Sequence, residues 1–234
     1  MSNNKNFPES KNLIIAIDGP AASGKSTVAL MLSKKLGLKY IDSGSMYRTV
    51  TLVSLEENVK ANDESSLVEI AKEVRRNFKI VLDSSGVKVF LGKRDVTSDI
   101  RSKEVGENVS PVSAFEGVRE EMVALQREMA KGGAVVEGRD IGSKVFPDAS
   151  LKVYLDAKVE ERIKRRYLEY KSKGKELKYE EVKREILLRD SIDSSRKASP
   201  LSIPQGAFVI DTTEITPGEV TDVIIKKCKT LAII

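Results

Sequence analysis

Histidine is absent from this 234-residue sequence, which contains no tryptophan and a single cysteine, Cys228. Without histidine, the chain cannot use the Ser-His or Cys-His pairs of nucleophilic catalysis, nor build the common histidine-containing zinc sites. One cysteine excludes an internal disulfide framework and a thiolate metal cage, so we expect Cys228 to be a packed thiol. Any chemistry is left to carboxylates, lysines, arginines and ions bound through oxygen.

Long apolar runs are also missing. The longest, such as LIIAI at residues 13–17, are far too short to span a bilayer, and the polar N-terminal segment lacks the apolar block of a signal peptide. We therefore expect a cytoplasmic protein without a membrane partner. Residues 1–12 are expected to be a flexible tail.

The rest of the composition is that of an ordinary globular protein. Hydrophobic residues make up 40% of the chain and charged residues 32%. The formal net charge of +5 suits a protein that handles anions, but it does not separate nucleic acid from nucleotides or phosphorylated metabolites. Because only 5% of the residues are aromatic and 35 acidic residues interleave with the basic ones, no base-stacking platform or continuous basic stripe is evident. We expect no nucleic-acid partner.

Short apolar runs alternate with helical patterns along the chain. The runs lie at 13–18, 39–42, 134–138, 151–157 and 207–212. They are not strictly alternating, which suits strands covered on both faces, so the pattern predicts an α/β fold with a parallel sheet. Apolar residues at helical spacing predict helices at 25–36, 65–78 and 119–133, the last ended by Gly132 and Gly133.

Two regions depart from this alternation. Residues 78–97 show two alternating segments around DSSG, which predict an antiparallel hairpin and hence a small insert in the parallel fold. Residues 157–197 are intensely charged, with Gly174 between two helical stretches. By composition alone, this second region is a solvent-exposed helical hairpin.

The segment GPAASGKS, from Gly19 to Ser26, matches the phosphate-binding pattern G-x-x-x-x-G-K-[ST]. It follows an apolar strand and opens a helix, where backbone N–H groups can surround phosphate oxygens. The motif predicts that Lys25 reaches the β and γ phosphates of a nucleoside triphosphate, and that the Ser26 hydroxyl holds Mg²⁺. The expected ATP-binding residues of this loop are Gly19, Pro20, Ala21, Ala22, Ser23, Gly24, Lys25, Ser26 and Thr27. Ala21 and Ala22 are expected in backbone conformations open to residues with a Cβ.

A P-loop does not say what the triphosphate is used for. The sequence lacks the N-K-x-D motif of a GTPase, and no glutamate arrangement typical of a motor or transporter ATPase follows AVVEGRD. A small kinase remains, and it needs a second site for its acceptor. Three polar clusters, at 41–48, 137–149 and 189–201, are candidates, since ligands bind beyond the carboxyl ends of strands in open α/β sheets. Gly138 and Gly142 are expected to let one strand end approach a nucleotide.

These clusters carry a resemblance more specific than the P-loop. With YIDSGSMYR, EGRDIGSKVFPDA and RDSIDSSRKASPL, the chain resembles the bacterial cytidylate kinases, of the nucleoside monophosphate kinase group, over about residues 13–213. The resemblance implies a five-stranded parallel core flanked by helices, a monophosphate-binding insert and a helical lid. The core would comprise 13–65, 112–160 and 198–234, the insert 66–111 and the lid 161–197.

The resemblance also implies an activity, namely ATP- and Mg²⁺-dependent phosphorylation of CMP and dCMP by direct transfer, which supplies pyrimidine nucleotides for nucleic-acid synthesis. Lys25, Arg139 and Arg189 would be the catalytic residues. The lid arginines Arg162, Arg165 and Arg166 would contact ATP. We expect a monomer whose partners are these small molecules.

The residues implied for CMP fall into three groups. Ser43 and Asp140 would accept hydrogen bonds from the amino group of cytosine, while Arg119 and Arg196 would donate to its ring acceptors. The monophosphate would be held by Arg48 and Arg139, and the ribose would face Ser110, Arg189 and Asp193.

Hydrogen-bonding chemistry agrees with the base-binding roles. Cytosine presents an amino donor beside two acceptors, so a carboxylate and guanidinium groups are complementary to it. Uracil reverses the pattern, and mismatches of buried polar groups can reject an analogue by about 10⁴-fold. The open alternatives are a P-loop kinase for another nucleoside monophosphate or a metabolite such as shikimate and, more remotely, a non-enzymatic basic nucleic-acid-binding protein.

Overall fold

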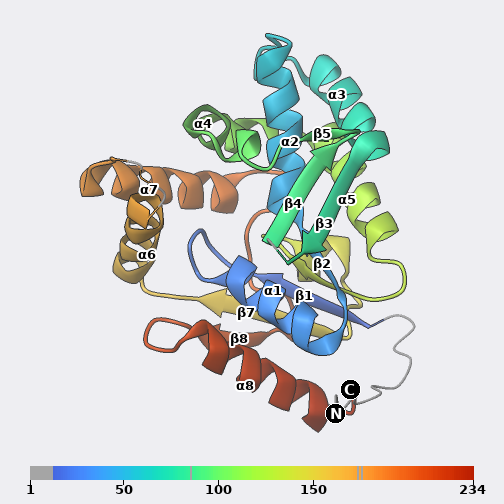
Figure 1. Cartoon of the computed structure of the whole chain (residues 1–234), viewed down its shortest axis with the longest axis vertical. Coiled ribbons are helices and arrows are strands. Elements are labelled where there is room, and N and C mark those ends of the chain that lie inside the picture. Colours follow the sequence, from blue (N-terminus) through green and yellow to red (C-terminus); the bar gives the residue numbers. More distant parts are fainter. Residues whose placement is uncertain (1–12, 85, 173, 175) are drawn as a thin grey trace.

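A five-stranded parallel sheet lies at the centre of the protein, in the order β2-β6-β1-β7-β8 (Figure 1). The computed structural model describes residues 13–84, 86–172, 174 and 176–234, so the expected tail at 1–12 lies outside the described residues. The predicted α/β fold with a parallel sheet is confirmed, and each strand begins and ends within one residue of its predicted run. The strands are β1 (Ile14–Asp18), β2 (Lys39–Asp42), β6 (Ala134–Glu137), β7 (Leu151–Asp156) and β8 (Phe208–Asp211).

Helices cover both faces of the sheet, which explains why the strands are apolar on both sides. Along β1, Ile15 and Ile17 pack with residues of α1 (Lys25–Leu36) and α8 (Pro217–Thr230), while Ala16 between them belongs to the opposite cluster. That cluster contains residues of α2 (Ser43–Glu56) and α5 (Glu116–Met129). Successive side chains of a strand point to opposite faces, so a buried sheet needs an apolar residue at every position.

The predicted hairpin is present as part of a small antiparallel sheet of three strands, β3 (Phe78–Asp83), β4 (Gly86–Leu91) and the short β5 (Arg94–Asp95). It packs with α3 (Glu64–Asn77), a 3₁₀ turn (Asp99–Arg101) and α4 (Lys103–Val112). Their apolar residues join the cluster of α2 and α5, so this region has no separate core. The expected limits of the insert, at residues 66 and 111, fall inside α3 and α4.

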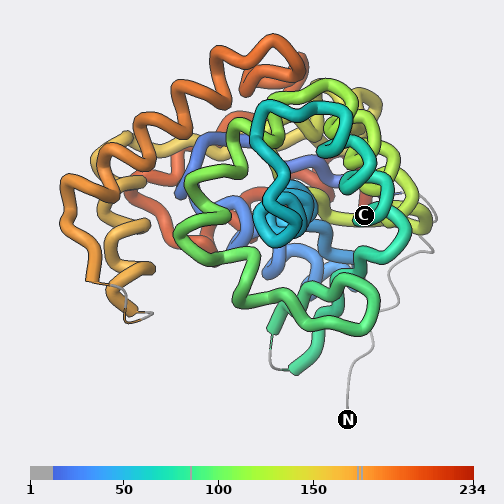
Figure 2. The backbone as a smooth tube through the Cα atoms, turned by 90° about the horizontal axis from the view of Figure 1, so that it is seen from above, coloured from blue at the N-terminus to red at the C-terminus, as the bar shows by residue number. Residues whose placement is uncertain are grey.

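The charged segment forms two helices, α6 (Val159–Ser172) and α7 (Tyr179–Ser195). They are not wholly solvated, because Ala21 of the P-loop packs with Ile163 of α6 and with Val182 and Ile186 of α7. Viewed from above, this orange arm and the teal-to-green insert surround the blue start of the chain (Figure 2). Within the described part of the chain, no helix has the length and apolar character needed to cross a membrane.

A close backbone contact explains the first glycine of the P-loop. Gly19 has a φ of +149°, and a Cβ built on it would lie 2.0 Å from the carbonyl oxygen of Leu155 in β7. Backbone atoms of a central strand cannot move aside, so the turn out of β1 requires glycine.

We predict that Gly19→Ala lowers the free energy of unfolding by about 3 kcal/mol or more, because the new Cβ overlaps the β7 backbone. Gly37→Ala is the control, since Gly37 has a φ of +66° but no atom within 4 Å of a built Cβ. That change should cost about 1–2 kcal/mol, the penalty of the left-handed conformation. Urea unfolding of the two variants measures both values, and equal losses would contradict the packing explanation.

Candidate active site

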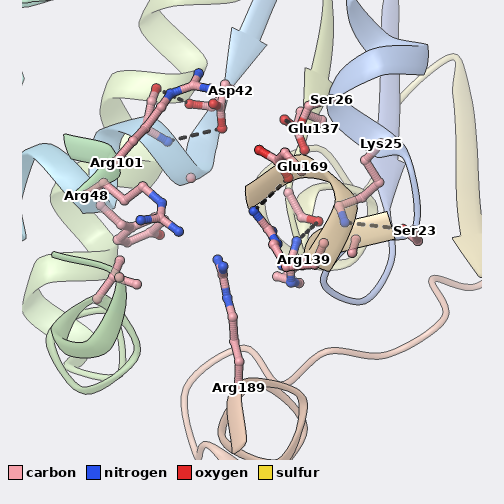
Figure 3. A pocket seen from close by; sticks show the side chains of 18 of the residues that line it. Ser23, Lys25, Ser26, Asp42, Arg48, Arg101, Glu137, Arg139, Glu169 and Arg189 are labelled. Carbon is pink, nitrogen blue, oxygen red and sulfur yellow. Dashed lines mark hydrogen bonds and ion pairs between the residues drawn. The ribbon is translucent and has the colours of Figure 1, made fainter. Parts of the chain in front are cut away.

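A cavity of about 1970 Å³ lies beyond the carboxyl edge of the sheet, among the P-loop, the insert and the lid (Figure 3). It brings together every residue predicted to bind CMP: Ser43, Arg48, Ser110, Arg119, Arg139, Asp140, Arg189, Asp193 and Arg196. The predicted ATP residues Ala22 to Thr27, Arg165 and Arg166 also line it. Segments up to about 170 residues apart in the sequence therefore share one site.

Four residues predicted to bind ATP do not line this cavity, namely Gly19, Pro20, Ala21 and Arg162. The buried Arg162 guanidinium donates to the carbonyl oxygens of Ala157 and Ala21 and forms an ion pair with Asp190. This helix position faces the P-loop backbone, and contact of Arg162 with the ATP phosphates stays a prediction. Arg162 holds the lid onto the P-loop.

The ammonium group of Lys25 lies inside the P-loop, with the residue only 5% exposed. It donates to the carbonyl oxygen of Pro20 at 2.6 Å and to Ser23 Oγ at 3.3 Å. Burial lowers the pKa of Lys25 well below its usual value, and the Arg139 guanidinium lowers it further, although Glu137 opposes both. An anion bound here would favour the charged ammonium and so raise the pKa of Lys25 again.

The second alanine of the P-loop differs from expectation. Ala22 has a φ of +58°, in the left-handed region where a Cβ costs about 1–2 kcal/mol. The expectation of an unrestricted conformation is wrong for Ala22, while Ala21 does not have a positive φ. The loop keeps a shape that glycine would adopt more easily.

Glu137, the last residue of β6, is a site residue that sequence analysis missed. Ser26 Oγ donates to Glu137 Oε1 at 2.5 Å, and the hydroxyl of Tyr40 lies 3.3 Å from the same oxygen. Burial raises the pKa of Glu137, and the nearby Asp42 raises it further. Figure 3 shows Ser26, Glu137 and Lys25 together beside the P-loop. The available signal was an acidic residue ending the apolar run AVVE, at the ligand-binding edge of the sheet.

One buried carboxylate, Asp193, faces three of the predicted arginines. Arg139 Nε donates to Asp193 Oδ2 at 2.9 Å, Arg189 Nε lies 4.0 Å from the same oxygen, and Arg196 Nη1 lies 3.6 Å from Oδ1. Burial opposes ionisation of Asp193, but these guanidinium groups, Arg139 foremost, hold its pKa below the usual value. The one negative charge of Asp193 therefore compensates the positive charges of three arginines only in part.

The excess positive charge faces the cavity. Arg189 extends from α7 toward Arg48 on α2 (Figure 3). Burial lowers the pKa of Arg189 to about 9, and its neighbours Arg139 and Arg48 contribute. Within the described residues, the buried Arg189 Nε and Arg196 Nη2 have no hydrogen-bond partner. Buried donors of this kind are normally satisfied, so the arrangement indicates an anion-binding site.

A carboxylate and a guanidinium that line the cavity lie side by side. Arg119 Nη2 donates to Asp140 Oδ2 at 2.5 Å, and Arg119 Nη1 donates to the carbonyl oxygen of Ser113 at 3.0 Å. The same guanidinium lies 5.1 Å from the centre of the Tyr47 ring. Ser43 Oγ donates to the carbonyl oxygen of Glu137 at 2.8 Å. Acceptor and donor groups are therefore fixed next to each other in a buried place.

Gly138 and Gly142 flank this turn, and Gly138 lines the cavity, so its approach to a nucleotide stays a prediction. A Cβ on Gly138 would lie 2.4 Å from Ser43 Oγ, and one on Gly142 would lie 3.0 Å from Lys152 Cγ. Both glycines thus make room for side chains of the protein itself.

We predict that Asp193→Ala lowers the free energy of unfolding at neutral pH by about 3 kcal/mol, because the arginines lose their buried counter-charge. Since the folded pKa of Asp193 is lowered, its contribution is present above about pH 4, its ordinary range, and is lost as the pH falls through the folded value. Asp222→Ala, which removes an exposed ion pair with Lys35, is the control and should cost below about 1 kcal/mol. Urea unfolding at pH 7 and pH 3 measures these free energies. Similar losses of stability in Asp193→Ala and Asp222→Ala at pH 7 would contradict the prediction.

Comparison with known proteins agrees with this geometry. The family described as cytidylate kinase matches residues 15–230. A cytidylate kinase of Caldanaerobacter subterraneus subsp. tengcongensis is 53% identical over 209 residues, which cover 89% of this chain and 91% of that protein. The cytidylate kinase of Bacillus subtilis is 46% identical over 217 residues, covering 92% and 96%, and that of a Geobacillus species is 49% identical over 214 residues, covering 90% and 94%. The chain belongs to the cytidylate kinase family.

Proposed function

We propose that this protein transfers the γ-phosphoryl group of ATP to CMP and dCMP, giving ADP and the cytidine diphosphates. The observation that carries the proposal is the buried pair of Asp140 and Arg119 in the same cavity as a P-loop. The P-loop accounts for the triphosphate, and the pair accounts for the choice of acceptor. Relatives named cytidylate kinase support the same activity.

In this proposal, the cytosine base binds next to the pair of Asp140 and Arg119. Asp140 and Ser43 accept from the cytosine amino group, and Arg119 and Arg196 donate to its ring nitrogen and carbonyl oxygen. Uracil would place a carbonyl against Asp140 and a ring N–H against an arginine. Because Asp140 is only 3% exposed, water cannot repair that mismatch, and discrimination of up to about 10⁴-fold is attainable.

The acceptor phosphate lies among the arginines. Arg48 and Arg139 bind it, and Arg189 stands between the two phosphate sites. The unpartnered Nε of Arg189 gives it a donor for this purpose. The ribose lies against Ser110, Arg189 and Asp193, which line the same cavity.

At the donor end, residues 19–27 bind the ATP phosphates through their backbone, with Lys25 on the β and γ groups. Arg165 and Arg166 are the lid candidates for further contacts. Arg165 donates to the carbonyl oxygen of Thr212, so it would have to exchange this partner for a phosphate oxygen.

Magnesium is the expected cofactor, and the residues present fit it. The hydroxyl of Ser26 and the carboxylate of Glu137 are hard oxygen ligands that lie together beside the P-loop. In the described ranges, no group of three or more acidic residues could cage a metal. That suits Mg²⁺, which takes one or two side chains and completes its shell with water and phosphate oxygens. When bound, it would neutralise negative charge on the phosphates.

The reaction needs no general base. The second pKa of a phosphomonoester is about 6, so the attacking oxygen is mostly unprotonated at neutral pH. The residues of this chain therefore act by alignment and by stabilising charge, with Lys25, Arg139 and Arg189 as the catalytic groups. Movement of α6 and α7 over ATP would exclude water that could otherwise hydrolyse it. A cytoplasmic monomer without nucleic-acid partners remains our expectation.

We predict that kcat/KM is highest for CMP and dCMP in a screen with UMP, AMP and shikimate as the other acceptors. ATP consumption measured for each acceptor at the same concentration checks this. A strong preference for any non-cytidine acceptor would contradict the proposal and favour another P-loop kinase. Tight, salt-sensitive retention of RNA without kinase activity would favour the nucleic-acid-binding alternative.

Two substitutions separate the proposed roles of donor and acceptor residues. Lys25→Ala is expected to slow transfer to every acceptor by about 10²-fold or more, because charge stabilisation at the transferred group is lost. Asp140→Ala is expected to lower the ratio of kcat/KM for CMP to that for UMP by about 10²-fold. Initial rates with both nucleotides give this ratio. An unchanged ratio in Asp140→Ala would show that this carboxylate does not recognise the base.

A further inference from the structure

Asp18, at the end of β1, is a fully buried carboxylate to which the proposed function assigns no role. Its two oxygens accept hydrogen bonds from the backbone amides of Ile141 and Gly142, each at 2.7 Å. These amides open the turn that directly follows Asp140, more than 120 residues later in the sequence. The end of β1 therefore holds the turn that carries a proposed base-binding residue.

The hydrogen bonds of Asp18 have a consequence for Asp140. Asp140 stands at the N-cap of the π-helical turn Ile141–Val145, and its carbonyl oxygen accepts from Lys144 at 2.9 Å. An aspartate in this position usually folds its carboxylate back onto the second or third amide of its own turn, here those of Gly142 and Ser143. Asp140 makes no such side-chain bond. Asp18 occupies the Gly142 amide, one of these two donors, and the carboxylate of Asp140 pairs with Arg119 instead.

The support comes from a rigid element. The amide of Gly138 donates to the carbonyl oxygen of Ile17 at 2.9 Å, immediately before Asp18 in β1. Both ends of the short segment 138–142 are thus tied to the central strand. Asp18 is the last residue of β1, and the P-loop begins at the following residue, Gly19. A displacement of this segment would move Arg139 and Asp140 relative to the P-loop.

Packing alone does not explain a carboxylate at this place. Burial raises the pKa of Asp18 to about 6, while the Gly142 and Ile141 amides oppose the rise. The charged neighbours also act in opposite directions, since Asp140 raises the pKa and Lys25 on α1 lowers it. Tyr154 of β7 faces Asp18 as well. An apolar side chain would fill a buried strand end with less loss of solvation. It could not, however, accept hydrogen bonds from the two backbone amides, as the carboxylate oxygens of Asp18 do.

We propose that Asp18 is a positioning residue for substrate selection, because it takes the amides of Ile141 and Gly142 and so leaves Asp140 directed at the nucleobase. This inference rests on the proposed function. Asp18 does not touch the nucleotide and acts through the turn that it holds.

The test compares Asp18→Asn and Asp18→Ala with the wild-type protein, using kcat/KM for CMP and for UMP at pH 7.5. Both variants weaken or remove the acceptors, so the carboxylate of Asp140 can turn back onto its own amides. We expect the CMP:UMP ratio to fall about tenfold or more, as misplacement of a binding group by about 1 Å commonly does. Asp63→Asn is the matched control, because Asp63 also accepts from a backbone amide, that of Ser66, but lies away from the cavity. Its ratio should stay unchanged.

A pH profile of the same ratio gives a second readout. CMP and UMP carry the same phosphate, so its ionisation cancels in the ratio, and titration of Glu137 beside Ser26 should affect both substrates alike. In the wild type, we expect the ratio to fall below about pH 6 as protonation of Asp18 weakens its acceptors. In Asp18→Asn, the ratio should be flat over this range. The wild-type profile is measurable even if the variants do not fold.

The outcomes separate the two ideas. A wild-type protein without a preference for CMP would overturn the proposed function. A wild-type preference that both Asp18 variants retain, or an equal loss with CMP and UMP, would overturn only the role of Asp18.

Discussion

Mutual repulsion among buried positive charges is the constraint around which this protein is organised. Arg139, Arg189 and Arg196 meet at one carboxylate, Asp193, and the Arg139 charge also lowers the pKa of Lys25. Such a site is stable only when anions share it. The protein supplies some of them in Asp193, Asp140 and Glu137, and two phosphate-bearing substrates would supply the rest.

The carboxylates have distinct purposes although they lie in one cavity. Glu137 is paired with a hydroxyl of the P-loop, Asp193 with the arginines, and Asp140 with Arg119. Each sits at an end of a strand or on a lid helix, where the chain can bring it next to groups from other segments. Separate segments of the chain thus each bring a carboxylate into one cavity.

The sequence predicted the strands closely because each is a short apolar run bounded by polar residues, and burial on both faces leaves no other pattern. The P-loop residues of the cavity were expected from a motif, and the remaining ones from the resemblance to cytidylate kinases. The sequence could not predict that Arg162 binds the P-loop backbone, because it does not show which face of α6 packs against the P-loop. Glu137 and Asp18 were missed for a related reason: a single acid ending an apolar run shows neither its burial nor its partner. Ala22 and Gly138 depended on backbone angles and contacts that appear only in three dimensions.

The two arms around the cavity are attached to the core in different ways. The insert shares one continuous apolar cluster with α2 and α5, from Leu67 on α3 to Met122 on α5. The lid meets the P-loop through a small cluster that includes Ala21, together with the polar contacts of Arg162 and Asp190. Separating the lid exposes much less apolar surface than separating the insert, so its displacement requires less free energy. Opening of the cavity should therefore occur by displacement of α6 and α7, which would carry Arg189, Asp193 and the C-cap residue Arg196 away from Asp140 and Arg119.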